Sequence, residues 1–149
     1  MKPIPNPFPW RSCFFCGDRN PVGLKLTFQE TGTEPRELVC RWAVPEVYSG
    51  FGKIVHGGFQ MGLFDEIMGW AVQHLVRQVG LTASLQVKFR SPLFVGQTIE
   101  VRCRIESKDG PRITLGSEIR NEAGIVCTTA TGVYVLMEAE RYEQMVGED

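Results

Sequence analysis

One long uninterrupted run constrains the fold of this chain more than any other feature. From Gly58 to Val79 the sequence has no proline, is rich in apolar residues and ends at Gly80, a pattern typical of a helix. The other patterned segments alternate apolar and polar residues, which predicts strands with one buried face. A single helix placed among strands predicts an α+β fold. Because this helix is apolar over most of its circumference, we expect the sheet to wrap around it.

Two predicted strands precede the helix and four follow it. The first two cover residues 24–28 and 38–42, and the alternating runs after the helix cover residues 85–89, 99–105, 113–119 and 125–137. The segments 108–111 and 121–124 carry Asp-Gly and Asn-Glu-Ala-Gly, which favour tight turns between neighbouring antiparallel strands. We therefore expect an antiparallel sheet of about five to six strands.

Length and charge limit the number of domains and the class of partner. The 149 residues predict a single domain over 1–149, with a Pro- and Cys-containing N-terminal segment (residues 1–22) and a short polar helix or tail (residues 138–149). Sixteen basic and seventeen acidic side chains leave a net charge of −1, which provides no positive field for nucleic acid or an anionic membrane. The chain shows neither a signal-peptide pattern nor a membrane-spanning run, so we expect a cytoplasmic protein.

The five cysteines raise the question of a metal or redox site. Cys13 and Cys16 have the two-residue spacing of both, whereas Cys40, Cys103 and Cys127 stand singly inside strand-like runs. A closed zinc site needs four ligands, and a redox dithiol usually precedes a helix in a βαβ unit. The sequence therefore favours packing or turn roles for Cys13 and Cys16, and we expect no metal.

The start of the predicted helix carries the first candidate site. The glycines of His56-Gly57-Gly58 leave backbone N–H groups sterically open, and the helix dipole adds partial positive charge there. Such a terminus can stabilise the oxyanion that develops on a carbonyl oxygen. The alternative is that Gly57 and Gly58 only form a tight loop-to-helix turn. His56 is either a base or a structural hydrogen-bonding side chain.

Helical spacing separates the adjacent acids Asp65 and Glu66. Glu66 shares its stripe with Gln73 and Arg77, which predicts a polar edge that reaches water or forms an ion pair. The helical neighbours of Asp65 are apolar or glycine: Met61, Gly62, Met68, Gly69 and Val72. A carboxylate on an apolar face is costly unless it has a purpose, so Asp65 is the candidate catalytic acid. The alternative is a buried aspartate satisfied by a backbone group or a threonine hydroxyl.

Several motifs together resemble the hotdog-fold acyl-CoA thioesterases of the PaaI-like family. They are the run from Tyr48 to Gly58, the acid nine residues after His56, the sequence Met68-Gly69-Trp70, the N-terminal Cys13-x-x-Cys16-Gly-x-x-Asn20-Pro21-x-Gly23-Leu24, and Val87-x-Phe89-x-Ser91-Pro92. The resemblance runs from about residue 13 to residue 136. It implies a long central helix wrapped by a curved antiparallel sheet, and protomers that associate as homodimers or homotetramers. It also implies an acyl-CoA substrate and no cofactor.

The resemblance assigns roles to four residues. The Gly57 N–H would polarise the thioester carbonyl, and Asp65, reaching in from the other protomer, would act as general base or as nucleophile. Thr82 occupies the place of a hydroxyl that orients the attacking water in some members. His56 would position the loop. Where several members carry Asn or Gln six residues before the histidine, this chain has Gly50, and Ser49 is the nearest replacement.

Four further residues are predicted to bind substrate. Gly58 belongs to the helix start, Phe51 and Met61 suggest an apolar acyl pocket, and Arg90 would contact the phosphates of coenzyme A. Two other functions stay open at this point. One is non-hydrolytic binding of acyl-CoA, and the other is a hotdog dehydratase or hydratase acting on 3-hydroxyacyl thioesters.

Overall fold

The computed structural model describes residues 1–147, so the last two residues of the predicted polar tail, Glu148 and Asp149, lie outside the described residues. One long helix follows the first three strands, and four more strands follow it. The elements are β1 (Lys2–Ile4), β2 (Phe28–Glu30), β3 (Leu38–Ala43), the short 3₁₀ helix η1 (Glu46–Tyr48), α1 (Gly57–Ala71), the π-helical turn η2 (Val72–Val76), β4 (Val79–Phe89), β5 (Thr98–Asp109), β6 (Arg112–Arg120), β7 (Val126–Met137) and α2 (Ala139–Val146).

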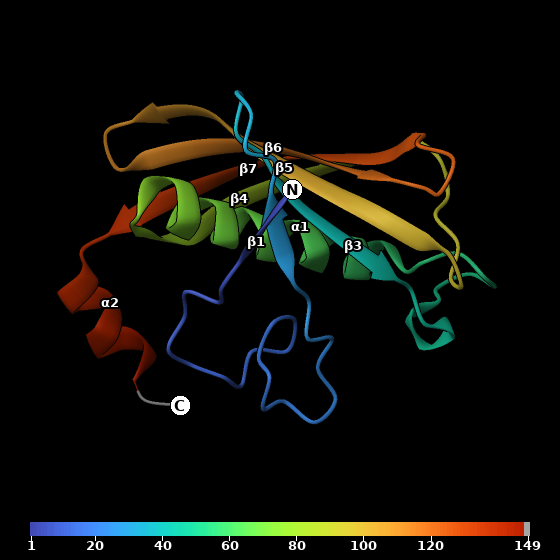
Figure 1. The fold of residues 1–149 in the computed structure, drawn as a ribbon, viewed down its shortest axis with the longest axis horizontal. Coiled ribbons are helices and arrows are strands. Elements are labelled where there is room, and N and C mark those ends of the chain that lie inside the picture. Colours follow the sequence, from blue (N-terminus) through green and yellow to red (C-terminus); the bar gives the residue numbers. More distant parts are fainter. Residues whose placement is uncertain (148–149) are drawn as a thin grey trace.

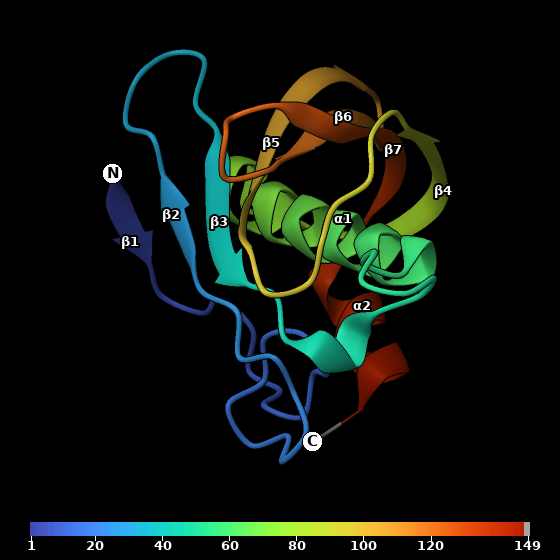
Figure 2. The same ribbon diagram turned by 90° about the vertical axis from the view of Figure 1, so that its right-hand side faces the viewer.

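All seven strands form one antiparallel sheet in the order β1-β2-β3-β5-β6-β7-β4. The sheet curves around α1, as the view in Figure 2 shows, so the predicted wrapped helix is confirmed. The N-terminal segment and α2 lie on the opposite side of α1 from the sheet (Figure 1). The arrangement is the hotdog fold, with α1 enclosed between the concave face of the sheet and these two terminal segments. No helix among residues 1–147 is long and apolar enough to cross a membrane.

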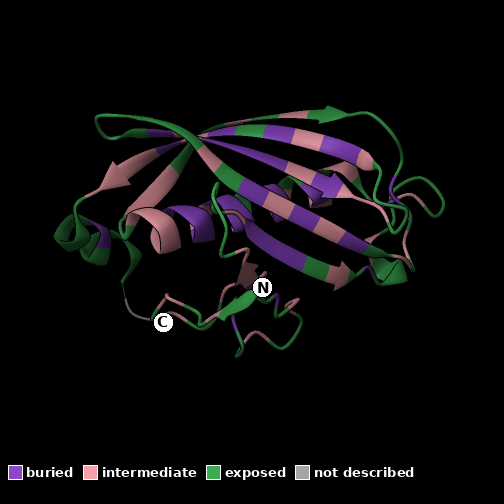
Figure 3. Ribbon diagram, turned by 45° about the horizontal axis from the view of Figure 1, so that its top comes forward, coloured by how far each residue is buried: buried purple, intermediate pink, exposed green. Residues whose placement is uncertain are grey.

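The core lies between α1 and the concave face of the sheet. On α1 the side chains of Leu63, Phe64, Ile67 and Met68 are almost completely buried. Buried residues alternate with exposed or half-buried ones along β5 and β6, giving the banded strands of Figure 3. This period of two places every second side chain against the helix, as the alternating sequence pattern predicts.

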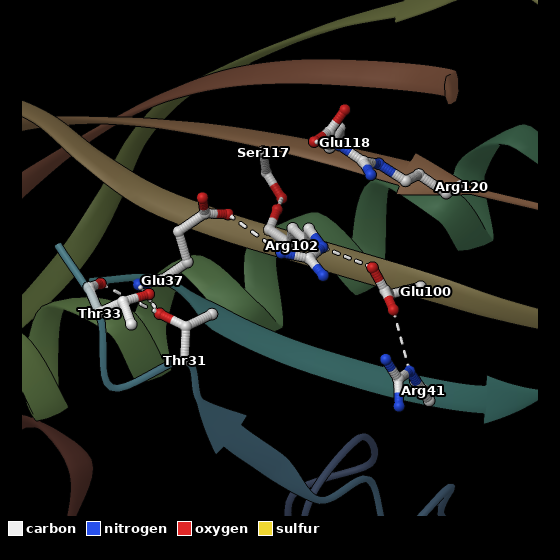
Figure 4. A network of polar contacts seen from close by, with 9 residues as sticks. All are labelled: Thr31, Thr33, Glu37, Arg41, Glu100, Arg102, Ser117, Glu118 and Arg120. Carbon is white, nitrogen blue, oxygen red and sulfur yellow. Dashed lines mark hydrogen bonds and ion pairs between the residues drawn. The ribbon is translucent and has the colours of Figure 1, made fainter. Parts of the chain in front are cut away.

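The outer face of the sheet carries polar side chains that pair across strands. Arg41 on β3 donates to Glu100 on β5 at 2.9 Å, and Arg102 contacts both Glu100 and Glu37 (Figure 4). On β6, Arg120 pairs with Glu118 at 2.8 Å. These residues alternate in sequence with the buried ones, so the same period that builds the core also gives a solvated outer face.

The N-terminal strands differ from their prediction. Residues 24–28 were expected to be extended, but Lys25 has a left-handed φ of 53°, which interrupts an extended strand. Leu24 and Leu26 donate their N–H groups to the carbonyls of Phe14 and Phe15 instead of to a neighbouring strand. The strand therefore begins only at Phe28. The Pro-rich start of the chain supplies an unexpected seventh strand, β1, at the sheet edge, where proline is tolerated.

The end of the long helix also differs from its prediction. The α-helix ends at Ala71, a π-helical turn continues to Val76, and Arg77 has the left-handed φ of 64° that closes it. Val79 and Gly80, expected to be the last helical residue and the stop signal, instead pair with Met137 and Leu136 in the sheet. Strand pairing with β7 is the reason that the helix is shorter and β4 longer than the local pattern indicates.

The side chain of Glu30 connects β2 to the turn after α1. From its contacts we expect the protein to lose stability in acid. It accepts hydrogen bonds from Arg36 and from His74, whose Nε2 lies 2.7 Å from Glu30 Oε2. The Arg36 hydrogen bond, followed by that of His74, lowers the pKa of Glu30 to about 2. A lowered carboxyl pKa stabilises the fold above the ordinary value of 4.5, and this contribution is lost as pH falls towards 2.

We expect Glu30→Gln to remove that dependence. Arg36 is 41% exposed, so solvent screening limits the contribution to the order of 1 kcal/mol. Thermal unfolding between about pH 5 and pH 2 should show a steeper fall in Tm for the wild type than for the variant. Parallel curves for the two proteins would show that the Glu30 contacts do not contribute.

Candidate active site

His56 is the N-cap of α1. Its Nδ1 accepts a hydrogen bond from the Gly58 N–H at 3.0 Å, so the neutral ring carries its proton on Nε2. The His56 carbonyl accepts the N–H groups of Phe59 and Gln60. This capping hydrogen bond holds the loop against the helix start.

The Gly57 N–H is the open donor at this helix start. Among residues 1–147 it has no hydrogen-bond partner, whereas the Gly58 N–H is occupied by the His56 ring. A surface cleft of about 420 Å³ lies here, lined by Ser49, Gly50, Phe51, Ile54, Val55, His56, Gly57 and Gly58. Phe51 is 88% exposed at its rim. The cleft has room for a carbonyl group whose oxygen accepts from the Gly57 N–H.

Two residues hold this loop in place. Gly50 lies close to His56: an added Cβ would come within 3.1 Å of the His56 Cα, so a larger residue at position 50 would need the loop to move by a few tenths of an ångström. The buried Gln60 donates to the Val55 carbonyl at 3.1 Å and accepts from the Thr128 hydroxyl at 2.6 Å. Gln60 thus ties the loop before α1 to β7, a role the sequence analysis missed.

Asp65 is held by two hydroxyl groups. Its Oδ1 accepts from Thr82 Oγ1 at 2.6 Å and from the Tyr134 hydroxyl at 2.5 Å. Burial, followed by the nearby Asp65 charge, raises the pKa of Tyr134, so the phenol stays protonated and remains a donor. Within residues 1–147, Asp65 Oδ2 accepts no hydrogen bond. The hydrogen bonds to Oδ1 therefore orient the carboxylate, and Oδ2 is free to accept a proton or to attack a carbonyl carbon.

Helical spacing puts Asp65 on an apolar face, with burial as the alternative to a catalytic role, and puts Glu66 on a polar edge that reaches water or forms an ion pair. The exposure of the two acids in the structure differs from this pattern. Asp65 is exposed in the single chain, whereas the Glu66 carboxylate packs beneath the N-terminal segment. Glu66 accepts from Trp70 Nε1 at 3.2 Å and lies 3.7 Å from Cys13 Sγ. Helical spacing describes only α1 itself, and the polar edge it predicts is covered by residues about fifty positions earlier in the chain.

Cys13, Cys16 and Glu66 form a compact titratable cluster beside Asp65. Burial raises the pKa of Glu66 to about 7. A hydrogen bond from Cys16, helped by nearby backbone N–H groups, lowers the pKa of Cys13 to about 5, and the same contact raises that of Cys16. The cluster and Asp65 line a common cleft of about 240 Å³, to which Thr82 and Tyr134 also contribute.

The remaining predicted site residues, Met61 and Arg90, lie on separate elements of the fold. Met61 is 37% exposed on α1, away from the cleft around Gly57. Arg90 is exposed just after β4, and its backbone N–H donates to Cys127. The preceding residue, Phe89, lies against the helix start, because a Cβ added to Gly57 would come within 3.3 Å of its ring.

Gly57 and Asp65 face different clefts of the same chain. Eight residues separate them along α1, which corresponds to about 12 Å of helix rise. One carbonyl group therefore cannot contact both the Gly57 N–H and the Asp65 carboxylate of a single chain.

Comparison with known proteins agrees with this fold. The sequence model described as the thioesterase superfamily matches residues 52–128, just over half of the chain. The chain belongs to the thioesterase superfamily. The matched region begins in the loop before α1 and extends into β7, so it includes Gly57, Asp65 and Thr82. No curated protein sequence matches the chain.

Solved structures from the superfamily share the fold at low sequence identity. A thioesterase superfamily protein, RHA08564, is 23% identical with a TM-score of 0.75; the match covers 84% of this chain and 63% of that one. A hypothetical thioesterase from Streptococcus pneumoniae, solved with coenzyme A, is 16% identical with a TM-score of 0.67, covering 74% and 85% of the two chains. The Escherichia coli PaaI protein is 16% identical with a TM-score of 0.62, covering 68% and 73%.

Tyr134 is the main residue of the site that sequence reasoning missed. It lies on β7, more than sixty positions after Asp65, inside an apolar strand pattern. No local spacing connects the two residues. The only available signal is that a tyrosine on the buried face of a strand usually needs a partner for its hydroxyl.

Proposed function

We propose that this thioesterase superfamily protein hydrolyses acyl-CoA thioesters to a free acid and coenzyme A. The observation that carries the proposal is the Asp65 carboxylate, oriented through Oδ1 by Thr82 and Tyr134 with Oδ2 unoccupied. The superfamily match and the unpaired Gly57 N–H support the same reaction class. The streptococcal neighbours solved with coenzyme A and with acetyl-CoA support this substrate class.

The proposed reaction needs an oxyanion donor and a base. The Gly57 N–H, at the positive end of α1, donates to the thioester oxygen and stabilises the charge that forms there. Asp65 Oδ2 removes a proton from water, the water oxygen attacks the carbonyl carbon, and the C–S bond then breaks. The departing thiolate of coenzyme A takes the proton. In the nucleophilic alternative, Asp65 attacks the carbonyl carbon itself and the C–S bond breaks, giving an anhydride and the thiolate of coenzyme A. Water then hydrolyses the anhydride to the free acid and the Asp65 carboxylate, and the proton released goes to the thiolate.

A complete site on this scheme takes Gly57 from one protomer and Asp65 from its partner. The two groups lie about 12 Å apart along one helix, so a homodimer or homotetramer has to bring them together. The exposed β4 lies at the end of the sheet order and beside Asp65, which makes it the proposed pairing edge. Light scattering should give a dimer or tetramer, whereas a stable active monomer would contradict the shared site.

The substrate contacts follow from the surfaces beside these groups. Phe51 and Phe89 flank the helix start and offer apolar contact to the substrate, and Met61 extends the exposed apolar surface of α1. Arg90, which forms no ion pair among residues 1–147, is the proposed contact for a phosphate of coenzyme A. We place the reaction in the cytoplasm because all five cysteines are free thiols.

A thiol-release assay over short, medium, long and aryl acyl-CoAs tests the proposal. We expect at least one of these thioesters to release free coenzyme A, with no added metal or organic cofactor in the assay. Tight acyl-CoA binding without turnover across the whole panel would instead identify a binding protein. Conversion of crotonyl-CoA to its 3-hydroxy product without thiol release would identify a hydratase.

A further inference from the structure

Three potential metal ligands lie close together and take no part in the proposed reaction: Cys13, Cys16 and Glu66. One ligand atom from each of the three side chains lies within 4.8 Å of the other two. Cys13 Sγ is 3.7 Å and 3.8 Å from the two carboxylate oxygens of Glu66. In a tetrahedral zinc site, bond lengths of about 2.3 Å to sulfur and 2.0–2.2 Å to oxygen put neighbouring ligand atoms about 3.5–3.8 Å apart. The Cys13–Glu66 distances match this spacing, and all three ligand atoms lie within 4.8 Å of one another, close enough to share a cation.

The chain forms a tight turn that presents both thiols on one side. The Gly17 N–H donates to the Cys13 carbonyl at 2.9 Å, and the Cys16 N–H points to Cys13 Sγ at 3.5 Å. A Cβ at Gly17 would come within 2.4–2.7 Å of the Arg11 and Cys13 backbone, so only glycine fits. Hydrogen bonds from Leu24 and Leu26 to Phe14 and Phe15 fasten the turn. The two sulfur ligands are thus organised before any ion binds.

The third ligand comes from a rigid element and is oriented by a neighbour. Glu66 lies in the middle of α1, and Trp70 Nε1, one helical turn later, donates to its Oε1 at 3.2 Å. A hydrogen bond of this kind orients the carboxylate, whose two oxygens lie at nearly equal distances from Cys13 Sγ. No local spacing connects Glu66 with the two cysteines, because it lies about fifty residues after Cys16.

The mixture of ligands selects the ion. Two thiolates exclude the hard cations Mg²⁺ and Ca²⁺, which prefer oxygen ligands, and a carboxylate disfavours Cu(I), which prefers sulfur. Zn²⁺ accepts both sulfur and oxygen. We propose that Cys13, Cys16 and Glu66 bind one Zn²⁺ ion with its fourth position open to the cleft that they share with Asp65. The ion ties the N-terminal segment to α1 at the residue next to the proposed catalytic acid.

Titration of the reduced, chelator-treated protein with Co²⁺ and then Zn²⁺ tests the site without any assay of hydrolysis. We expect one Co²⁺ per chain, with the sulfur-to-cobalt charge-transfer bands and strong ligand-field bands of a tetrahedral thiolate site, and bleaching of both by Zn²⁺. Cys13→Ser and Cys16→Ser should each weaken binding at least about tenfold and reduce the charge-transfer bands. Glu66→Gln should weaken Zn²⁺ binding by a similar factor while the charge-transfer bands persist.

Cys127→Ala is the matched control, because Cys127 is buried on β7 and does not belong to the cluster; it should bind like the wild type. Absence of thiolate charge-transfer bands in the wild type would overturn the site, as would unchanged binding in Cys13→Ser. If the serine variants fail to fold, the wild-type spectrum and Glu66→Gln decide, since glutamine keeps the shape of the side chain and an acceptor for Trp70. A Cys13–Cys16 disulfide whose reduced form takes up no Zn²⁺ would assign the pair to redox chemistry instead.

Discussion

Asp65→Asn is expected to lower the rate of acyl-CoA hydrolysis at least about a hundredfold while leaving the fold intact. Asparagine keeps the Oδ1 atom that accepts from Thr82 and Tyr134, so both hydrogen bonds persist. It replaces Oδ2, the oxygen free for catalysis, with an amide that neither removes a proton from water nor attacks a carbonyl. Thiol release measured beside thermal unfolding separates the two effects: the rate should collapse and the Tm should change little.

Two further variants sharpen this test. Asp109→Asn, at the exposed end of β5, is the matched control and should hydrolyse acyl-CoA at the wild-type rate. Thr82→Val removes one of the two donors to Asp65 Oδ1 and should lower the rate by roughly tenfold, less than loss of the carboxylate itself. Full activity in Asp65→Asn, with loss of activity in Glu66→Gln, would show that the assignment of the two adjacent acids is wrong.

Of the substitutions that we propose, Trp70→Ala is expected to destabilise the fold most, lowering the free energy of unfolding by about 3–5 kcal/mol. The Trp70 indole joins three parts of the molecule. It extends from α1, packs against Phe28 of β2 in a tilted arrangement with 4.3 Å between ring centres, and contacts Phe8 of the N-terminal segment edge-on at 5.9 Å. Only 3% of the residue is exposed, so truncation leaves a cavity that these elements cannot close without moving.

Denaturant unfolding of Trp70→Ala and of a milder variant, Trp70→Phe, checks this prediction. Trp70→Phe keeps an aromatic ring against Phe28 but loses the Nε1 hydrogen bond to Glu66, so we expect a smaller loss of about 1–3 kcal/mol. Trp42→Ala serves for comparison, because Trp42 is only half-buried between Tyr48 and Phe59 and should cost less than Trp70→Ala. Equal effects of the two alanine variants would mean that Trp70 does not connect these elements.

Much of the site followed from patterns within short segments. The glycines after His56 predict an open helix start, and the unpaired Gly57 N–H agrees with that expectation. Asp65, the acid nine residues after His56, is the predicted catalytic residue because its helical neighbours are apolar or glycine. In the structure, Thr82 and Tyr134 orient it at the surface, whereas the prediction was an apolar surrounding.

The amino-acid sequence by itself determined the helix among strands, because apolar periodicity is a property of neighbouring residues. It also determined the Cys13–Gly17 turn as a distinct motif, although not its use. Only the tertiary structure decided which acid on α1 is covered, since the N-terminal segment folds back over Glu66 from about fifty residues away. Burial and pairing of this kind depend on contacts between distant segments, and no local period records them.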